Sequence, residues 1–356
     1  MLIAALTAAL ALSACAANEN PAPADSGSVL GGTLNAGGSS AQTAAQDAWR
    51  SGFQDANSGV TVNYDPVGSG AGRTGFVSGA YAVVGTDDAF SPDELSAGGF
   101  ALCATSDIVE VPAYISPIAF AFNLPGITSL NLDAATAAGI MTGAITTWDD
   151  AAIAALNPGV SLPSTAITPV HRSDKSGTTG NVTDYLSQAA PDVWTFGRTE
   201  TWPDTLAGEA AEKTQGVVTA IQSANGAVGY VDASQATGLG VANLINAGSP
   251  VAPTANAATK ALAASSLQSG RGATDLAFDV ARMPADATAY PMIMVSYLVA
   301  CGQYSDAATG ALAKAYAAYV VSDEGQQAAA SNAGSAPLSV DPALSAKVIA
   351  AVDTIS

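Results

Sequence analysis

The spacing of apolar residues along this chain predicts an alternation of strands and helices. Val60, Val62 and Tyr64 alternate with polar residues, which is the pattern of a half-buried strand. Trp49 and Phe53 lie four positions apart, as on the buried face of a helix. Strands that alternate with helices are typical of an α/β fold, in which helices cover a sheet. We therefore expect an α/β protein.

Longer apolar stretches extend this pattern over most of the chain. Residues 110–124 and 290–301 are almost continuously apolar and predict two buried strands. Further helices are expected at 132–142, 148–156, 207–221 and 308–321, and a further strand at 227–231. A tail follows the last of these helices and runs to Ser356.

These elements are most simply arranged as two lobes. We expect the first lobe to contain residues 32–112 and 289–356, and the second lobe residues 113–288. The chain would then cross between the lobes near residues 112 and 289, and these two crossovers would form a hinge.

The N-terminus has the features of an export signal. Residues 1–15 form an apolar run that is too short to span a membrane and ends in small residues. The run ends in Leu-Ser-Ala-Cys, which is similar to a bacterial lipobox, so we expect Cys15 to be lipidated, although no Lys or Arg precedes the run. The alternative is a free thiol in a cleaved peptide. Residues 16–31 are rich in Pro, Gly and Ser, as in a flexible tether.

Composition narrows the class of ligand. The chain has 356 residues, of which 49% are hydrophobic, and a formal net charge of −19 with only 11 basic residues. Such a balance excludes nucleic-acid binding, which requires a basic surface. It does not exclude a small anion, because a buried site is governed by its own donors. The chain has one histidine and no Cys/His cluster with ligand spacing, so we expect neither a metal nor a cofactor.

Two cysteines remain after Cys15. In an exported chain an even number of cysteines favours a disulfide, here between Cys103 and Cys301. The alternative is a pair of buried free thiols.

The segment 171–180, His-Arg-Ser-Asp-Lys-Ser-Gly-Thr-Thr-Gly, carries the clearest candidate chemistry. Apolar residues at helical spacing follow it, so Ser176 to Thr179 is expected to begin a helix. The unpaired N–H groups and the positive dipole end at a helix N-terminus bind anions, and Arg172 would add a guanidinium suited to an oxyanion. The alternative is an ordinary Ser/Gly helix cap.

Three other turns have a similar character, each after a predicted strand. They are Asn-Ala-Gly-Gly-Ser-Ser at 35–40, Gly-Ser-Gly-Ala-Gly-Arg at 68–73 and Gly-Thr-Asp-Asp-Ala at 85–89. Glycine lets the backbone approach a ligand closely, and an α/β sheet gathers such turns along one edge.

Together these turns, the segment at 172–178 and the segment Thr-Trp-Asp-Asp-Ala at 147–151 resemble the phosphate-binding lipoproteins of the Pst-type ABC import system. The resemblance runs from about Leu34 to Pro337. It implies a two-lobed Venus-flytrap fold, with two mixed sheets flanked by helices, that closes on a buried inorganic phosphate. It also implies delivery of phosphate to an ABC permease from the outer face of the bacterial cell membrane, with the lipid anchor as the only membrane contact. We expect a monomer that is not an enzyme.

The resemblance also assigns roles to particular residues. It implies ligand hydroxyls at Ser40, Ser69, Ser176 and Thr178, and backbone donors at Ala41 and Gly177. It also implies an arginine at Arg172, held in place by Asp174, and a carboxylate at Asp88. Two positions depart from the family pattern. Ser40-Ala41 replaces Thr-Phe, which keeps the hydroxyl and the main-chain donor, and Lys175 replaces a glycine.

An acid in an anion site has a chemical purpose. Phosphate near pH 7 keeps at least one proton, because its second pKa lies near ~6–7, so Asp88 would accept a hydrogen bond from it. Sulfate has no such proton. A site that requires one hydrogen bond rejects an analogue lacking it by roughly 10⁴-fold.

Three alternatives remain open at this stage. The chain could bind another oxyanion such as sulfate, or act as a phosphatase or hydrolase through Ser176, or serve as a structural surface lipoprotein. A hydrolase of the triad kind needs a histidine beside its serine. The single histidine, His171, is expected at a strand end or at the rim of the cleft.

Overall fold

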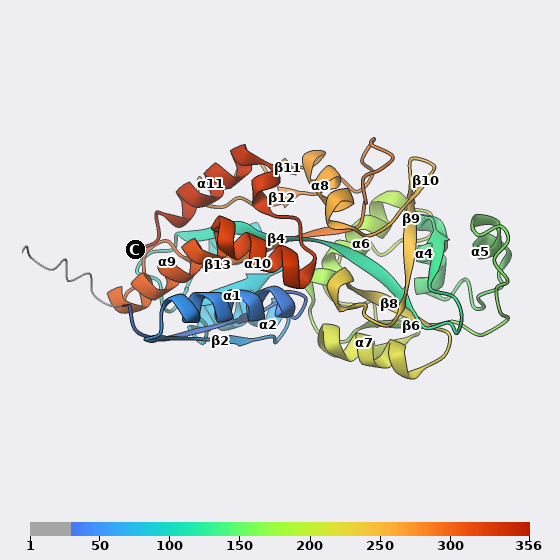
Figure 1. Ribbon diagram of the computed structural model, residues 1–356, viewed down its shortest axis with the longest axis horizontal. Coiled ribbons are helices and arrows are strands. Elements are labelled where there is room, and N and C mark those ends of the chain that lie inside the picture. The colour runs from blue at the N-terminus through green and yellow to red at the C-terminus, as the bar shows by residue number, and fades with distance from the viewer. Residues whose placement is uncertain (1–29) are drawn as a thin grey trace, which may run out of the picture.

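The computed structural model describes residues 30–356, and an eleven-stranded sheet runs through it (Figure 1). The strand order is β2-β1-β3-β13-β4-β8-β6-β7, and β9 pairs with β4, β5 and β10 beside this path. The strands are β1 (Gly32–Gly38), β2 (Val60–Asp65), β3 (Val83–Thr86), β4 (Ile108–Phe122), β5 (Ser129–Leu132), β6 (Thr168–Arg172), β7 (Glu209–Ala211), β8 (Ala227–Asp232), β9 (Gly240–Asn246), β10 (Ser249–Val251) and β13 (Ile293–Cys301).

Strand β4 connects the two lobes. All 15 of its residues are buried, as its almost uninterrupted apolar sequence predicts. From Ile108 to Pro117 it pairs with β13, and from Ile118 to Phe122 it pairs with β8. The first lobe is therefore built around β1, β2, β3 and β13, and the second around β5 to β10. The two expected mixed sheets share β4, which runs from one lobe into the other in Figure 1.

Helices from both ends of the chain cover the first lobe. They are α1 (Thr43–Ala56), α2 (Ser69–Ser78), α3 (Pro92–Ala97), α9 (Ala307–Val321), α10 (Asp323–Ala333) and α11 (Pro342–Val352). Phe53 of α1 packs edge-on against Tyr316 of α9, with ring centroids 5.4 Å apart. Trp49 donates a hydrogen bond of 2.8 Å from Nε1 to the carbonyl of Gly325. Trp49 and Phe53, which lie on one face of α1, thus attach α1 to α9 and α10.

The second lobe consists of the middle of the chain. Its helices are α4 (Ala134–Thr142), α5 (Ala151–Leu156), α6 (Gly177–Ala189), α7 (Lys213–Ser223) and α8 (Ala255–Ala263). Trp148 is fully buried against Phe122 of β4, and its Nε1 donates to the carbonyl of Gly226 at 3.0 Å. The indole therefore joins the loop before α5 to the shared strand and to the turn before β8.

The α/β class and the strands predicted near 60–64, 110–124, 227–231 and 290–301 are confirmed, with ends shifted by a few residues. The prediction of one helix over 207–221 is wrong in its first part. Glu209–Ala211 instead forms β7 and pairs with the otherwise open edge of β6, and α7 begins only at Lys213. Pairing at the sheet edge overrides the helix propensity of this alanine-containing segment. The tail after Val321 contains α10 and α11, which the sequence analysis does not predict.

Residues 266–279, which follow α8 in the chain, pack against the first lobe. Strands β11 (Ser266–Leu267) and β12 (Phe278–Asp279) form a small separate ladder. The loop between them contacts the start of β4, because Thr274 donates from Oγ1 to the carbonyl of Ile108 at 2.9 Å. Arg271 donates to the carbonyl of Phe90 at 2.7 Å. This loop therefore packs beside the turn that follows β3.

The predicted disulfide between Cys103 and Cys301 is confirmed. Cys103 lies five residues before β4, and Cys301 is the last residue of β13. The bridge joins the first-lobe ends of two adjacent antiparallel strands, so it closes a loop that contains the whole second lobe.

The predicted export segment, the lipidation site Cys15 and residues 16–29 of the tether lie outside the residues that the structure describes. Within residues 30–356, no helix is both long enough and apolar enough to cross a membrane.

Removal of the disulfide should destabilise the first lobe. The bridge spans 198 positions of sequence, and loss of a native disulfide typically costs about 2–5 kcal/mol. We expect Cys103→Ala combined with Cys301→Ala to lower the free energy of unfolding by that amount in urea titrations monitored by circular dichroism. Wild-type protein reduced with dithiothreitol is the control. Coincident unfolding curves for the oxidised wild type and the double variant would contradict this expectation.

Candidate functional site

Three turns of the first lobe meet at the carboxyl ends of its parallel strands. Ser39 and Ser40 follow β1, Ser69 begins α2 after β2, and Asp87 follows β3 directly. Because β1 pairs in parallel with both β2 and β3, the three turns lie at the same edge of the sheet. The sequence prediction that the Gly/Ser turns converge is therefore correct for this lobe.

The second lobe contributes the segment between β6 and α6. Arg172 ends β6, and Ser176 is the N-cap of α6, where its Oγ accepts a hydrogen bond of 3.2 Å from the backbone N–H of Thr179. Gly177 and Thr178 are the first two residues of the helix, so their N–H groups have no partner within it. The predicted helix start at Ser176 is confirmed.

The two lobes touch at this point. Thr178 donates from Oγ1 to Asp87 Oδ2 at 3.1 Å, and Asn181 donates from Nδ2 to the carbonyl of Asp87 at 2.7 Å. Gly177 allows this approach, because a Cβ atom at that position would lie only 2.8 Å from the backbone N of Asp88. The N-terminus of α6 therefore rests directly on the turn after β3.

Asp87 is the acid at the centre of the contact. Its residue is 3% exposed, and hydroxyls surround its carboxylate. Oδ2 accepts from Ser39 at 2.7 Å, from Thr178 at 3.1 Å and from Ser69 at 3.4 Å, and Oδ1 accepts from Ser296 of β13 at 2.6 Å. A buried carboxylate needs such a set of donors to replace water.

The sequence analysis named Asp88 rather than Asp87 as the site carboxylate, and the structure places Asp88 differently. Asp88 is half-buried and forms an ion pair with Arg198 of the second lobe. None of the hydroxyls around Asp87 bonds to its side chain among the described residues. Successive residues after a strand point in different directions, so only one of two adjacent acids can face the hydroxyls.

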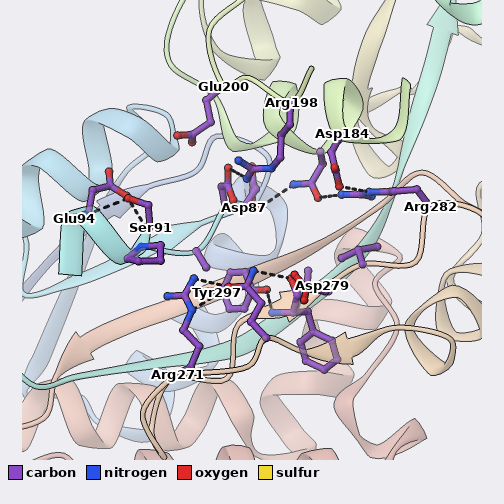
Figure 2. Close-up of a pocket in the computed structure, with 18 of the residues that line it drawn as sticks. Asp87, Ser91, Glu94, Asp184, Arg198, Glu200, Arg271, Asp279, Arg282 and Tyr297 are labelled. Atoms are coloured by element: carbon purple, nitrogen blue, oxygen red, sulfur yellow. Dashed lines mark hydrogen bonds and ion pairs between the residues drawn. The ribbon is translucent and has the colours of Figure 1, made fainter. Parts of the chain in front are cut away.

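Asp87 and Asp88 both line a cavity of about 600 Å³. Figure 2 shows Asp87 among the charged side chains around this cavity. Charged side chains of both signs line this cavity, among them Glu94, Arg198, Glu200, Arg271 and Arg282. Burial raises the pKa of Asp88 to about 6, and the negative charge of Glu200 adds to this effect, although Arg198 opposes it. Of the predicted binding residues, only Asp88 lines this cavity, but Asp87 and Asn181 also line it, so the cavity adjoins the contact between Thr178 and Asp87.

Asp174 holds Arg172 in place, as the family resemblance implies. The Nε of Arg172 donates to Asp174 Oδ1 at 2.7 Å, and its Nη2 bonds to Asp174 Oδ2. Burial alone would raise the pKa of Asp174, but the hydrogen bonds and charge of Arg172 outweigh burial and hold that pKa below its usual value. Gly68 of the first lobe lies against the pair, since a Cβ there would be 2.5 Å from Asp174 Oδ2. Within the described residues Nη1 of Arg172 makes no hydrogen bond.

Ser40 and Ala41 follow Ser39 in the turn after β1 and make a separate contact with the second lobe. Ser40 Oγ is 3.0 Å from Thr214 Oγ1 and accepts a second bond of 3.0 Å from the backbone N–H of Thr214. The backbone N–H of Ala41 donates to Ser39 Oγ at 3.1 Å. The first loop thus touches the start of α7, which the sequence analysis did not connect with the site.

Ion pairs join the lobes around the edge of the contact. Arg73 pairs with Glu200 at 2.6 Å and with Glu94 at 3.2 Å, and Lys175 pairs with Glu94 at 3.5 Å. Lys175, the residue that departs from the family pattern, therefore reaches an acid of the first lobe from the second. Burial lowers the pKa of Arg73, but Glu200 and Glu94 together raise it above its ordinary value, so this guanidinium remains charged.

His171 lies at the end of β6, as predicted. Its ring stacks on Trp202 with centroids 5.0 Å apart, and its Nδ1 is 3.2 Å from the carbonyl of Arg172. Burial lowers the pKa of His171, which favours the neutral ring. In residues 30–356 there is no hydrogen bond between Ser176 and His171, and no group of three His, Cys, Asp or Glu side chains is placed to hold a metal ion.

The site as a whole is suited to hold a small oxyanion. One guanidinium, the first turn of a helix and several hydroxyls provide donors, and a single buried carboxylate provides an acceptor. The sequence analysis identified most of these residues but missed Ser39, Asp87, Thr214 and Ser296. The pair Asp87-Asp88 and the pair Ser39-Ser40 were visible as candidates, whereas nothing local marked Thr214 or Ser296.

Known proteins share this sequence and fold. The family model described as a PBP superfamily domain matches residues 22–324. Phosphate-binding protein PstS 2 of Mycobacterium tuberculosis is 33% identical over 362 residues, covering 98% of this chain and 95% of the relative. Phosphate-binding protein PstS 3 of the same organism is 35% identical over 325 residues, covering 86% of each.

Solved structures resemble the fold. A periplasmic phosphate-binding protein called PfluDING, solved with bound phosphate, superposes with a TM-score of 0.70 at 23% identity, covering 90% of this chain and 93% of its own. A phosphate-binding protein from Stenotrophomonas maltophilia has the same TM-score and coverage at 19% identity. The sequence match to the PstS proteins extends over nearly the whole chain, and the chain belongs to the PstS family of phosphate-binding proteins within the PBP superfamily.

Proposed function

We propose that this protein binds inorganic phosphate between its two lobes and delivers it to an ABC permease. The observation that carries the proposal is that Thr178, at the N-terminus of α6, donates to the buried carboxylate of Asp87 in the other lobe. Arg172 lies beside Gly68, the residue before Ser69, and Ser69 donates to the same carboxylate. The names of the relatives, which are phosphate-binding proteins, support the same ligand.

We propose the ligand set that the family resemblance implies, with one change that the geometry supports. Ser40, Ser69, Ser176 and Thr178 supply hydroxyls, Ala41 and Gly177 supply backbone donors, and Arg172 supplies a guanidinium steadied by Asp174. Asp87 takes the part that the sequence analysis gave to Asp88. Ser69 and Thr178 now donate to Asp87 at 3.4 and 3.1 Å, and both hydroxyls can turn to phosphate oxygens when the anion enters.

The carboxylate then gives the site its selectivity. A phosphate oxygen that carries a proton donates to Asp87 Oδ2, replacing the bonds that Ser69 and Thr178 give up. Sulfate carries no proton at neutral pH, so it would face the buried charge of Asp87 without a hydrogen bond between them. Unpaired buried groups are costly, and this is why phosphate is favoured over other oxyanions.

Binding is coupled to closure of the lobes. Donors come from both lobes, so the full set is assembled only when they meet, as expected of hinge closure around a ligand. We infer that β4 and the segment before β13 form this hinge, with lobe boundaries near residues 112 and 289. The closed form is then the species that the permease recognises, and a monomer anchored through lipidated Cys15 presents it outside the cell membrane.

A hydrolytic role is not favoured. The hydroxyl of Ser176 caps α6, and the ring of His171 stacks on Trp202, so the serine has no adjacent base among the residues described. We infer a binding protein rather than an enzyme. An assay with p-nitrophenyl phosphate should detect no turnover, and turnover abolished by Ser176→Ala would contradict this inference.

Calorimetric titration tests the ligand directly. Protein freed of bound ligand by unfolding and refolding should release heat on titration with phosphate, with one site per chain, and show no saturable heat with sulfate at the same concentration. Saturable sulfate binding as tight as phosphate binding would favour the sulfate alternative. Binding of neither anion would overturn the proposed function.

The assignment of the acid to Asp87 can be separated from Asp88 by a matched pair of variants. Asp87→Asn removes the charge that faces the hydroxyls, so the preference for phosphate over sulfate should fall by 10-fold or more, which is about 1.4 kcal/mol. Asp88→Asn removes the neighbouring charge, which pairs with Arg198, and should leave the preference within about 2-fold. Competition calorimetry measures both. The assignment fails if Asp88→Asn changes the preference and Asp87→Asn does not.

Arg172 should account for a large part of the affinity. Loss of a buried partner of an anion costs about 2–5 kcal/mol, so Arg172→Ala should weaken phosphate binding by that amount in calorimetry. Arg50→Ala, on the exposed side of α1, is the control and should bind as the wild type does. A dissociation constant unchanged by Arg172→Ala would remove the guanidinium from the site.

A further inference from the structure

The junction between β7 and α7 has an unusual backbone. Lys213, the first residue of α7, has a φ of +63°, and it is one of two non-glycine residues with positive φ between residues 30 and 356. Side chains disfavour this conformation, so tertiary contacts must hold it in place. Such contacts are present on both sides of the junction.

Two successive backbone N–H groups at this junction point to two different parts of the site. The N–H of Lys213 donates to Asp174 Oδ1 at 3.0 Å, on the acid that holds Arg172. The N–H of Thr214 donates to Ser40 Oγ at 3.0 Å, across the contact between the lobes. The strained turn therefore links the arginine of the second lobe to the first loop of the other lobe.

Thr214 acts on Ser40 through two atoms. Its Oγ1 is 3.0 Å from Ser40 Oγ, and either oxygen can be the donor. Thr214 is 2% exposed and Ser40 is 5% exposed, so water does not compete for these bonds. A serine hydroxyl accepts up to two bonds and donates one. The N–H of Thr214 can only donate, so it always occupies one acceptor position of Ser40.

The hydroxyl of Thr214, by contrast, can either donate to Ser40 Oγ or accept from it. When it accepts from Ser40, the proton of Ser40 is used within the protein. When it rotates and donates, both acceptor positions of Ser40 are filled by Thr214, and the only remaining role of Ser40 is to donate its proton to the anion. The backbone N–H and the hydroxyl of Thr214 can therefore supply the hydrogen bonds of Ser40 Oγ before phosphate binds, and direct its proton toward the anion during binding.

We propose that Thr214 is a positioning residue for phosphate, which fixes the hydroxyl of Ser40 as a donor to the anion when the lobes close. This inference rests on the proposed function. A role in merely holding the loop is already filled by Gln235, whose Nε2 donates to the carbonyls of Ser40 and Ala41 at 3.1 and 3.0 Å. Thr214 adds control of the side chain, which Gln235 does not touch.

The test compares variants of Thr214 and Ser40 singly and together. Thr214→Val keeps the shape and the backbone N–H but removes the hydroxyl, and Thr214→Ser restores it. Thr219→Val makes the same change on the exposed face of the same helix and is the control. Phosphate dissociation constants are measured by calorimetry and dissociation rates by stopped flow, after circular dichroism confirms that each variant is folded.

We expect Thr214→Val to weaken phosphate binding by about 10-fold, mainly through faster dissociation, because one hydrogen bond to a buried polar group is lost. Thr214→Ser and Thr219→Val should bind within about 2-fold of the wild type. In the Ser40→Ala background, Thr214→Val should have almost no further effect, because Thr214 acts through Ser40.

Two results would overturn the inference while leaving the proposed function intact. One is wild-type affinity in Thr214→Val, and the other is an undiminished loss when Thr214→Val is added to Ser40→Ala. Failure of the wild-type protein itself to bind phosphate would instead overturn the proposed function.

Discussion

The burial of Asp87 sets the conditions for the rest of the site. A carboxylate removed from water needs hydrogen-bond donors at both oxygens, and Asp87 obtains them from four hydroxyls. Those hydroxyls belong to distant parts of the chain: the turns after β1 and β2, the start of α6, and β13. Ser39, Ser69 and Ser296 of the first lobe already reach both carboxylate oxygens, and contact with the second lobe adds the fourth hydroxyl, that of Thr178.

The guanidinium of Arg172 must also be compensated, because it is buried like the carboxylate of Asp87. Arg172 is buried, and an isolated buried guanidinium would be as costly as an isolated acid. Asp174, two residues further along, neutralises it and occupies two of its nitrogens. The close approach of Gly68 leaves no space for a side chain between this pair and the first lobe. Charge compensation and steric fit together hold the guanidinium in place, and its Nη1 makes no hydrogen bond to residues 30–356.

Most ion pairs around the contact contribute less to the free energy than the buried groups do. The side chain of Arg198 is 48% exposed, and a pair as exposed as this one contributes about 0–1 kcal/mol. Arg73 is an exception, because it is buried between Glu94 and Glu200. The mechanical link between the lobes is β4, and the disulfide fixes β4 and β13 together at their first-lobe ends. The proposed hinge in β4 and in the segment before β13 is where we expect the lobes to move relative to one another.

The sequence by itself determined the α/β class, the buried strands at 110–124 and 290–301, the helix start at Ser176 and the pairing of Cys103 with Cys301. These features depend on local periodicity, on capping chemistry or on a simple count, and neighbouring residues are enough to specify them. The tertiary structure alone surrounded Asp87 rather than Asp88 with hydroxyls, turned residues 209–211 into an edge strand, and brought Thr214 to Ser40. Each of these outcomes depends on a partner far away in the sequence, such as the open edge of β6 or a hydroxyl 174 positions distant. Because hydrogen bonds and strand pairing act through space, no pattern of neighbouring residues could reveal them.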